Sequence, residues 1–204
     1  MTLSKRFTLA VKGAFDGIVA ALLMVFTLPL MIGIAWGVHK DSPGPIFFKQ
    51  TRIGQAGKPF VMWKFRTMRL GAEREWVAPS ANEIDSYRFQ DIGDPRITKI
   101  GRWLRRTSLD ELPQLYNVLV GDMSLVGPRP EIPEMVALYS EDMHRRHQMK
   151  PGLTGLAQVS GRGDLSTGES IRWDLDYVDH WNLWLDLKIL WWTVGIVARH
   201  EGAQ

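Results

Sequence analysis

The sequence predicts a mostly helical α+β protein that is attached to a membrane, and three observations support this. Residues 17–38 form a segment of 22 residues without a charge. Short apolar and aromatic runs at residues 46–48 and 60–65 predict the two strands of a β-hairpin. Five of the nine tryptophans lie between Trp173 and Trp192, and tryptophan favours the membrane–water interface. We expect a membrane-anchoring segment over residues 1–40 and one small folded core over residues 41–204.

The composition narrows the class of protein. A chain of 204 residues is long enough for one domain with a modest core. It contains no cysteine, which excludes disulfides and thiolate metal sites. The net charge of +3 favours anionic partners such as phospholipid headgroups, nucleotides or nucleic acid.

The apolar segment leaves two membrane arrangements open. Twenty-two residues in a helix reach about 33 Å, which is enough to span a bilayer. Pro29, however, removes a backbone hydrogen bond near the middle and predicts a kink. We expect the Thr27 hydroxyl to bond a carbonyl freed there. The flanks favour a cytoplasmic location for both ends, because basic residues stand on either side: Lys5, Arg6 and Lys12 before, and Lys40, Lys49 and Arg52 after. A spanning helix and a kinked helix that returns to the same side both remain, whereas a cleavable signal peptide is disfavoured by the length of the segment.

The middle of the chain alternates between predicted structure and polar surface. Alternation in the second strand places Lys64 and Arg66 on one face. Residues 71–93 are polar and predict a short helix and a loop at the surface. Residues 96–106 predict a basic helix, suited to a membrane surface or to nucleic acid.

An acidic pair, Asp110 and Glu111, follows this basic helix. Carboxylates can hold Mg²⁺ or act as nucleophiles, and arginines bind phosphate oxygens through paired N–H groups. Arg105 precedes the pair and Arg129 follows it, so the stretch suits an anion bound together with a metal. The structural alternative is a capping box in which Ser108 caps a helix and Glu111 reaches back to it. Pro113 limits that helix, so the pair lies at or before its first turn.

The C-terminal half predicts further helices. Residues 131–147 predict one helix with a basic end, where His144 and His147 have the spacing of metal ligands but lack a convincing third ligand. Residues 150–163 form a glycine-rich loop that contains Arg162. Residues 170–200 predict a helix that lies at the membrane interface.

Seven segments together resemble the bacterial polyprenyl-phosphate phosphoglycosyl transferases, the small monotopic class of sugar-1-phosphate transferases. The resemblance implies that the N-terminal helix is re-entrant, although this chain has Leu28-Pro29 where the family has Ser-Pro. It also implies a catalytic domain on the cytosolic face. The matching segments are KFRTM at 64–68, DPRIT at 94–98, RRTSLDELPQ at 105–114, GDMS at 121–124, GPRP at 127–130, KPGLTGLAQ at 150–158 and SGR at 160–162.

The resemblance further implies a reaction. A UDP-sugar gives its sugar-1-phosphate to a polyprenyl (undecaprenyl) phosphate, and UMP leaves; this is the first membrane step of surface glycan or exopolysaccharide synthesis. Asp110 would form a covalent phosphosugar intermediate beside Glu111, and both carboxylates would hold Mg²⁺. The implied substrate contacts are Lys64, Arg105, Arg129 and Arg162.

The implied setting is the cytoplasmic face of the bacterial inner membrane, with phospholipid and no nucleic acid as partner. A homo-oligomer stays open. Two other classes of function are a membrane-surface nucleic-acid-binding protein, suggested by the basic helix, and a scaffold without catalytic activity. The intact acidic pair and its arginines argue against the scaffold.

Overall fold

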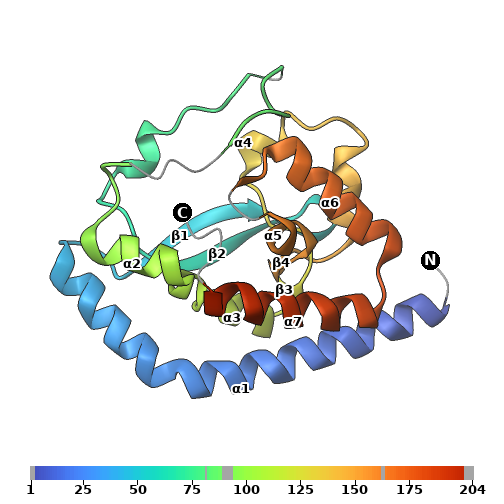
Figure 1. Ribbon diagram of the computed structural model, residues 1–204, viewed down its shortest axis with the longest axis horizontal. Helices are drawn as coiled ribbons and strands as arrows, with labels where there is room; N and C mark the ends of the chain where they lie inside the picture. Colours follow the sequence, from blue (N-terminus) through green and yellow to red (C-terminus); the bar gives the residue numbers. More distant parts are fainter. Residues whose placement is uncertain (1–2, 81, 89–93, 162–163, 200–204) are drawn as a thin grey trace.

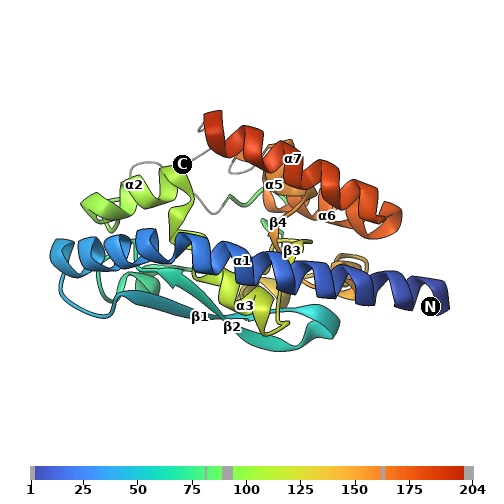
Figure 2. The same ribbon diagram turned by 90° about the horizontal axis from the view of Figure 1, so that it is seen from below.

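The structure is a computed structural model that describes residues 3–80, 82–88, 94–161 and 164–199, with residues 3–6 and 197–199 described by backbone alone. One long helix, α1, lies along one side of the molecule, and the other elements lie above it in Figure 1. In Figure 2, α2 and α7 lie on one side of α1, and the hairpin β1–β2 lies on the other. The predicted α+β class, mostly helical with small sheets, is confirmed.

Helix α1, Leu3–Asp41, continues through Pro29, and its axis bends along its length (Figure 1). It is the one helix in the described part of the chain that is long and apolar enough to cross a membrane, and 11% of its most apolar stretch is buried. The Thr27 hydroxyl donates to the carbonyl of Leu23 at 2.7 Å. That carbonyl is not the one freed by Pro29, which belongs to the residue four positions before it, so the predicted Thr27 contact is wrong in its acceptor.

Both halves of α1 are attached to the rest of the protein. Near its start, Lys12 Nζ lies 2.8 Å from Asp186 Oδ2, and Ser124 Oγ donates to Asp16 at 2.6 Å. Near its end, Ile34 and Val38 are buried in a cluster with Phe65 and Leu104. Lys12, one of the basic residues that precede the apolar segment, is buried and paired inside the protein.

The predicted hairpin is confirmed and is longer than expected. Strands β1, Phe47–Ile53, and β2, Pro59–Phe65, pair antiparallel, with Phe48 opposite Lys64. The short 3-10 helix η1, Gln55–Gly57, forms the tip. Arg66 follows β2 and donates to the carbonyls of Ser42 and Pro43, so it closes the turn before β1.

The basic helix begins three residues later than expected. Arg96 pairs with Asp94 through Nη2 and Oδ2 at 2.6 Å, and Thr98 caps α2, Lys99–Thr107, by accepting from Gly101 N. In the described residues of the polar segment before it, the short 3-10 helix η2, Ala72–Glu75, is followed by turns at residues 82–86.

The centre of the molecule follows α2 along the chain. Gly121 ends α3 with a φ of 88°, a backbone conformation that favours glycine. Strands β3 and β4, which are more than twenty residues apart in sequence, then pair as a small parallel sheet. The two segments pass so close to each other that a Cβ atom added at Gly152 would lie 2.1 Å from Gly127 N. The elements are η3, Leu109–Glu111; α3, Gln114–Leu119; β3, Ser124–Val126; and β4, Gly152–Thr154.

The single helix predicted for residues 131–147 is wrong. The segment holds α4, Pro133–Val136, and the 3-10 helix η4, Met143–Gln148, with turns between them. Arg146 in η4 is buried, where it donates to Tyr139 Oη and pairs with Asp174. This buried pairing, rather than helical propensity, decides the local backbone.

The C-terminal helix is also broken. Helix α5, Leu156–Ser160, precedes α6, Thr167–His180, and α7, Leu183–Arg199. A capping box of Ser166 and Glu169 starts α6, and Trp181 separates it from α7 with extended backbone. Asp186 of α7 is buried. Its carboxylate accepts hydrogen bonds from Tyr177 Oη at 2.8 Å and from Trp181 Nε1 at 3.2 Å, which compensate for the loss of water. We call this group of five buried residues, Lys12, Asp16, Ser124, Tyr177 and Asp186, together with the partly buried Trp181, the anchor cluster.

Candidate active site

The acidic pair lies in the tight turn between α2 and α3. Ser108 ends α2 in the left-handed region, with a φ of 57°, and its N–H donates to the carbonyl of Arg105. Asp110 and Glu111 follow in η3, before the first turn of α3, as predicted. The capping box is not formed, since the Glu111 carboxylate is bonded elsewhere.

Glu111 is held by two cations. Lys64 Nζ lies 2.8 Å and Arg129 Nη2 lies 3.0 Å from the same oxygen, Oε1. Burial raises the pKa of Glu111, but the charges and hydrogen bonds of Lys64 and Arg129 outweigh it, so the pKa lies well below its usual range. Glu111 is therefore ionised, and its Oε1 is held by both cations.

Asp110 is different, although it is the neighbouring residue. It is buried, yet within the described residues no hydrogen bond reaches its carboxylate, and Lys64 Nζ lies 4.0 Å from Oδ2. Burial raises the pKa of Asp110, and the nearby charge of Lys64 opposes this shift. A weakly solvated carboxylate that lacks close donors is available to a substrate or a metal.

Of the other predicted residues, Arg129 joins the pair directly and Arg105 lies beside it. The Arg105 guanidinium donates from Nε to Thr67 Oγ1 at 3.0 Å, and its charge acts on Asp110. Arg129 is held through its backbone, because Arg146 Nη2 donates to the Arg129 carbonyl at 2.6 Å. Arg162 lies outside the described residues.

Several residues that position the site were missed by sequence reasoning. Arg52 donates from Nη1 to the carbonyl of Pro130 at 3.0 Å, which joins β1 to the turn that carries Arg129. Asn117 of α3 donates to the Val61 carbonyl at 2.7 Å and accepts from Trp63 N at 3.1 Å, so it ties α3 to β2. These contacts connect segments more than fifty residues apart, and no local pattern reports them.

A small cavity lies against Glu111 and Arg129. Gln114 in the first turn of α3 also lines it; the residue is 3% exposed, and its Nε2 has no hydrogen-bond partner in the described part of the chain. An unsatisfied buried amide costs about 1–3 kcal/mol. Its other lining residues are Arg52, Met62, Pro130 and Gly152.

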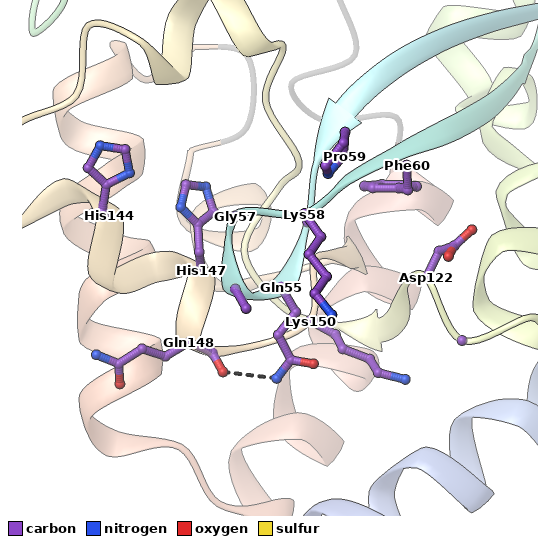
Figure 3. A pocket seen from close by; sticks show the side chains of 13 residues that line it. Gln55, Gly57, Lys58, Pro59, Phe60, Asp122, His144, His147, Gln148 and Lys150 are labelled. Atoms are coloured by element: carbon purple, nitrogen blue, oxygen red, sulfur yellow. Dashed lines mark hydrogen bonds between the residues drawn. The ribbon is translucent and has the colours of Figure 1, made fainter.

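A larger cavity, of about 720 Å³, lies at the tip of the hairpin (Figure 3). The predicted site residues that the structure describes do not line it. Figure 3 shows the side chains of Lys58 and Lys150 between Phe60 and Asp122 on one side and His147 on the other. His144 and His147 have ring centroids 5.6 Å apart. No group of three or more His, Cys, Asp or Glu that could hold a metal occurs among the described residues.

The acidic pair is suited to a Mg²⁺ ion that binds together with a phosphate group. Magnesium in phosphate-handling sites is held by one or two carboxylates, together with substrate phosphates and water, rather than by a cage of protein ligands. Asp110, whose carboxylate lacks donors, has this character. The surrounding cations, Lys64, Arg105 and Arg129, suit the phosphate oxygens that would complete such a site.

Fold and site together define a protein with a long apolar helix and, in its folded core, a carboxylate–cation cluster suited to phosphate esters. Comparison with known proteins identifies the family to which the chain belongs. It belongs to the bacterial sugar transferase family, whose model matches residues 7–200. The predicted family is therefore confirmed.

Three relatives illustrate the similarity. The chain is 42% identical to the undecaprenyl-phosphate galactose phosphotransferase of Salmonella typhimurium, over 98% of this chain and 43% of the relative. It is 44% identical to the UDP-glucose:undecaprenyl-phosphate glucose-1-phosphate transferase of Escherichia coli, over 90% of this chain and 39% of the relative. It thus spans about two fifths of these two proteins. It is 44% identical to the uncharacterized sugar transferase EpsL of Bacillus subtilis, over 95% of this chain and 90% of the relative.

Proposed function

We propose that this protein transfers a sugar-1-phosphate from a UDP-sugar to undecaprenyl phosphate, giving undecaprenyl diphosphate sugar and UMP. The names of the Salmonella and E. coli relatives describe transfer to the same lipid. The observation that carries the proposal is the unequal pair: Glu111 is neutralised by two cations, while Asp110 beside it lacks hydrogen-bond donors in the described part of the chain.

The first half of the proposed reaction forms a bond to Asp110. One carboxylate oxygen of Asp110 attacks the phosphorus that bears the sugar, the bond from that phosphorus to the bridging oxygen breaks, and UMP leaves with the electron pair. Lys64 and Arg129 lie beside the reacting carboxylate and stabilise the negative charge that gathers on the phosphate oxygens. Their pairing with Glu111 holds both cations in place before the donor arrives.

The second half releases the enzyme. An oxygen of the lipid phosphate attacks the same phosphorus, the bond to Asp110 breaks, and the carboxylate is regenerated. No proton or electron is left over in either half. Because Asp110 has little solvent around it, water competes poorly with the lipid phosphate for the intermediate.

Magnesium would be held by Asp110 and Glu111, where it would neutralise charge on the diphosphate. The chain itself already supplies three cations near the pair, Lys64, Arg105 and Arg129. The metal and these side chains would therefore together neutralise the negative charge of the diphosphate.

We further propose that α1 is re-entrant, so that residues 1–40 anchor residues 41–204 to the cytoplasmic face of the inner membrane. Both halves of α1 contact the same side of the protein, through Lys12 near the start and Val38 near the end. A helix that spanned the bilayer would carry one of these contacts to the opposite face. The exposed tryptophans of α1, α2 and α7 suit the interface: Trp36, Trp103, Trp184, Trp191 and Trp192.

The test is UMP release by detergent-purified protein with Mg²⁺ and undecaprenyl phosphate, across a panel of UDP-sugars. We expect release from one donor or a few, dependent on Asp110 and accelerated by lipid phosphate. Stoichiometric UMP release without lipid would report the covalent intermediate. Absence of release from every donor, with protein that remains folded and membrane-bound, would overturn the proposal.

A further inference from the structure

The two cavities described above are neighbours. Three separate chain segments each contribute one residue to the small cavity and another, two positions along the chain, to the large one. In extended chain, two positions correspond to about 7 Å. The cavities are therefore successive parts of one surface. From the small cavity to the large, the pairs are Met62 and Phe60, Arg52 and Gly54, and Gly152 and Lys150.

The small cavity suits an anionic oxygen. Two guanidiniums, those of Arg52 and Arg129, line it against the single carboxylate of Glu111. The amide Nε2 of Gln114 is a buried donor with no partner in the described chain, and it lines the same space. A phosphate oxygen would satisfy that donor, and it would lie beside two guanidiniums that each have a carboxylate partner, Arg129 with Glu111 and Arg52 with Glu131.

The large cavity suits a polar, partly aromatic group. Within the described residues, neither Lys58 nor Lys150 has an ion-pair partner, and both side chains enter the cavity (Figure 3). Phe60 offers an aromatic ring, and Asp122 offers an acceptor for hydroxyl groups. Burial and the nearby charges of Arg146 and His144 lower the pKa of His147 to about 4, so its ring is neutral near pH 7.

Only one substrate of the proposed reaction fits this surface. The polyprenyl chain is apolar and belongs in the bilayer, not in a cavity lined by lysine, histidine and aspartate. We propose that the donor nucleotide lies along β2, with its diphosphate against Arg129 and Gln114 and its nucleoside in the hairpin-tip cavity. This inference rests on the proposed function and assigns the substrate class to a site beside the acidic pair.

The strand provides the path between the two ends. Phe60, Met62 and Lys64 share one face of β2, because side chains alternate along a strand. From Phe60 to Lys64 the strand rises about 13 Å. An extended nucleoside diphosphate can bridge such a span, with its sugar-bearing phosphorus at Asp110 and its base beside Phe60. The ammonium groups of Lys58 and Lys150 then donate hydrogen bonds to the oxygens of the nucleoside beside Phe60.

The experiment measures the affinity of full-length protein in lipid nanodiscs for UMP. We expect the double variant Lys58→Ala with Lys150→Ala to raise the Kd for UMP about tenfold or more, as loss of charge-assisted contacts would. Gln114→Leu should raise it severalfold. The matched control, Lys99→Ala, removes an exposed lysine of α2 that lines neither cavity, and should bind UMP as the unchanged protein does. Thermal midpoints of all variants exclude a loss of folding.

The outcomes separate the two proposals. Unchanged UMP affinity in the double variant would overturn the placement of the nucleotide, and so would an altered preference among UDP-sugars with unchanged UMP affinity, which would indicate a sugar site. Asp110→Asn should bind UMP normally and release none from a donor. If unchanged protein releases no UMP from any donor, yet binding depends on Lys58 and Lys150, the proposed reaction fails while the nucleotide site stands.

Discussion

The anchor cluster and the acidic pair are built from the same parts: each holds a lysine between two carboxylates. In the anchor cluster, Lys12 lies 2.8 Å from Asp186 and 3.6 Å from Asp16. At the acidic pair, Lys64 lies 2.8 Å from Glu111 and 4.0 Å from Asp110. Burial and the central lysine do not distinguish them, although the acidic pair also has the guanidiniums of Arg105 and Arg129 nearby.

Hydrogen bonding distinguishes them. Every carboxylate of the anchor cluster accepts a further bond, from Ser124 to Asp16 and from Tyr177 and Trp181 to Asp186. At the acidic pair, Asp110 accepts none from the described residues. A buried ion pair by itself therefore indicates neither stability nor function; what sets the acidic pair apart is a carboxylate without hydrogen bonds, within the part of the chain that the structure describes, next to three cations.

The largest expected effect is at Asp110. Asp110→Asn should abolish UMP release and lipid product, because the amide is not a nucleophile for phosphorus. Its thermal midpoint should stay the same or rise, since the change removes a desolvated charge without losing a hydrogen bond. The matched change at the other cluster, Asp16→Asn, should instead lower the midpoint. Measurable turnover by Asp110→Asn would contradict the assignment of the nucleophile.

Arg129→Ala should have the next largest effect, a loss of turnover of about 10²-fold or more. The residue contacts Glu111, and its side chain is 43% exposed, so its removal costs little stability. Flotation with vesicles should be unchanged. Loss of membrane binding in this variant would make Arg129 structural rather than catalytic.

Substitutions in the anchor cluster should lower the stability of the protein rather than its turnover. Lys12→Ala leaves two buried carboxylates without their cation and should cost about 3–5 kcal/mol in the free energy of unfolding. The double variant Lys12→Met with Asp186→Leu should recover part of this loss, because one of the two uncompensated carboxylates is removed while Tyr177 and Trp181 lose their acceptor. If the double variant were as unstable as the single one, the pair would contribute more than charge compensation.

The smallest expected effect is at Tyr177. Tyr177→Phe removes a buried hydroxyl that donates to Asp186 and should cost about 1–2 kcal/mol. UMP release per folded molecule should not change. A large loss of turnover at unchanged stability would show that the anchor cluster acts on the site, and the contrast between the two regions would fail.

The sequence predicted those features that depend on neighbouring residues. The hairpin was predicted from two short apolar and aromatic runs, and Pro113 correctly placed the acidic pair before α3. Helix ends set by distant packing were not found, as at residues 131–147, where buried Arg146 decides the backbone. The break at Trp181 was missed for the same reason, because it turns Asp186 toward Lys12, which lies 174 residues away in sequence.

The candidate site was predictable in its charges and not in their arrangement. Lys64, Asp110, Glu111 and Arg129 do come together, as the family resemblance implied. Nothing local indicated that Glu111 takes both cations and leaves Asp110 open. Gln114 was visible only as part of a matching segment, since an unpaired amide is a property of three-dimensional packing.

The bent helix α1 supplies one wall of the protein interior, because Ile34 and Val38 share a cluster with Phe65 and Leu104. Phe65 follows Lys64 directly, so the long apolar helix and the lysine at the acidic pair rest on the same few side chains. A flexible tether would let a catalytic centre move freely above the lipid headgroups. In the membrane arrangement proposed above, the depth of the site is instead fixed when the chain folds, and a form made by deleting residues 1–41 would lose part of its own core.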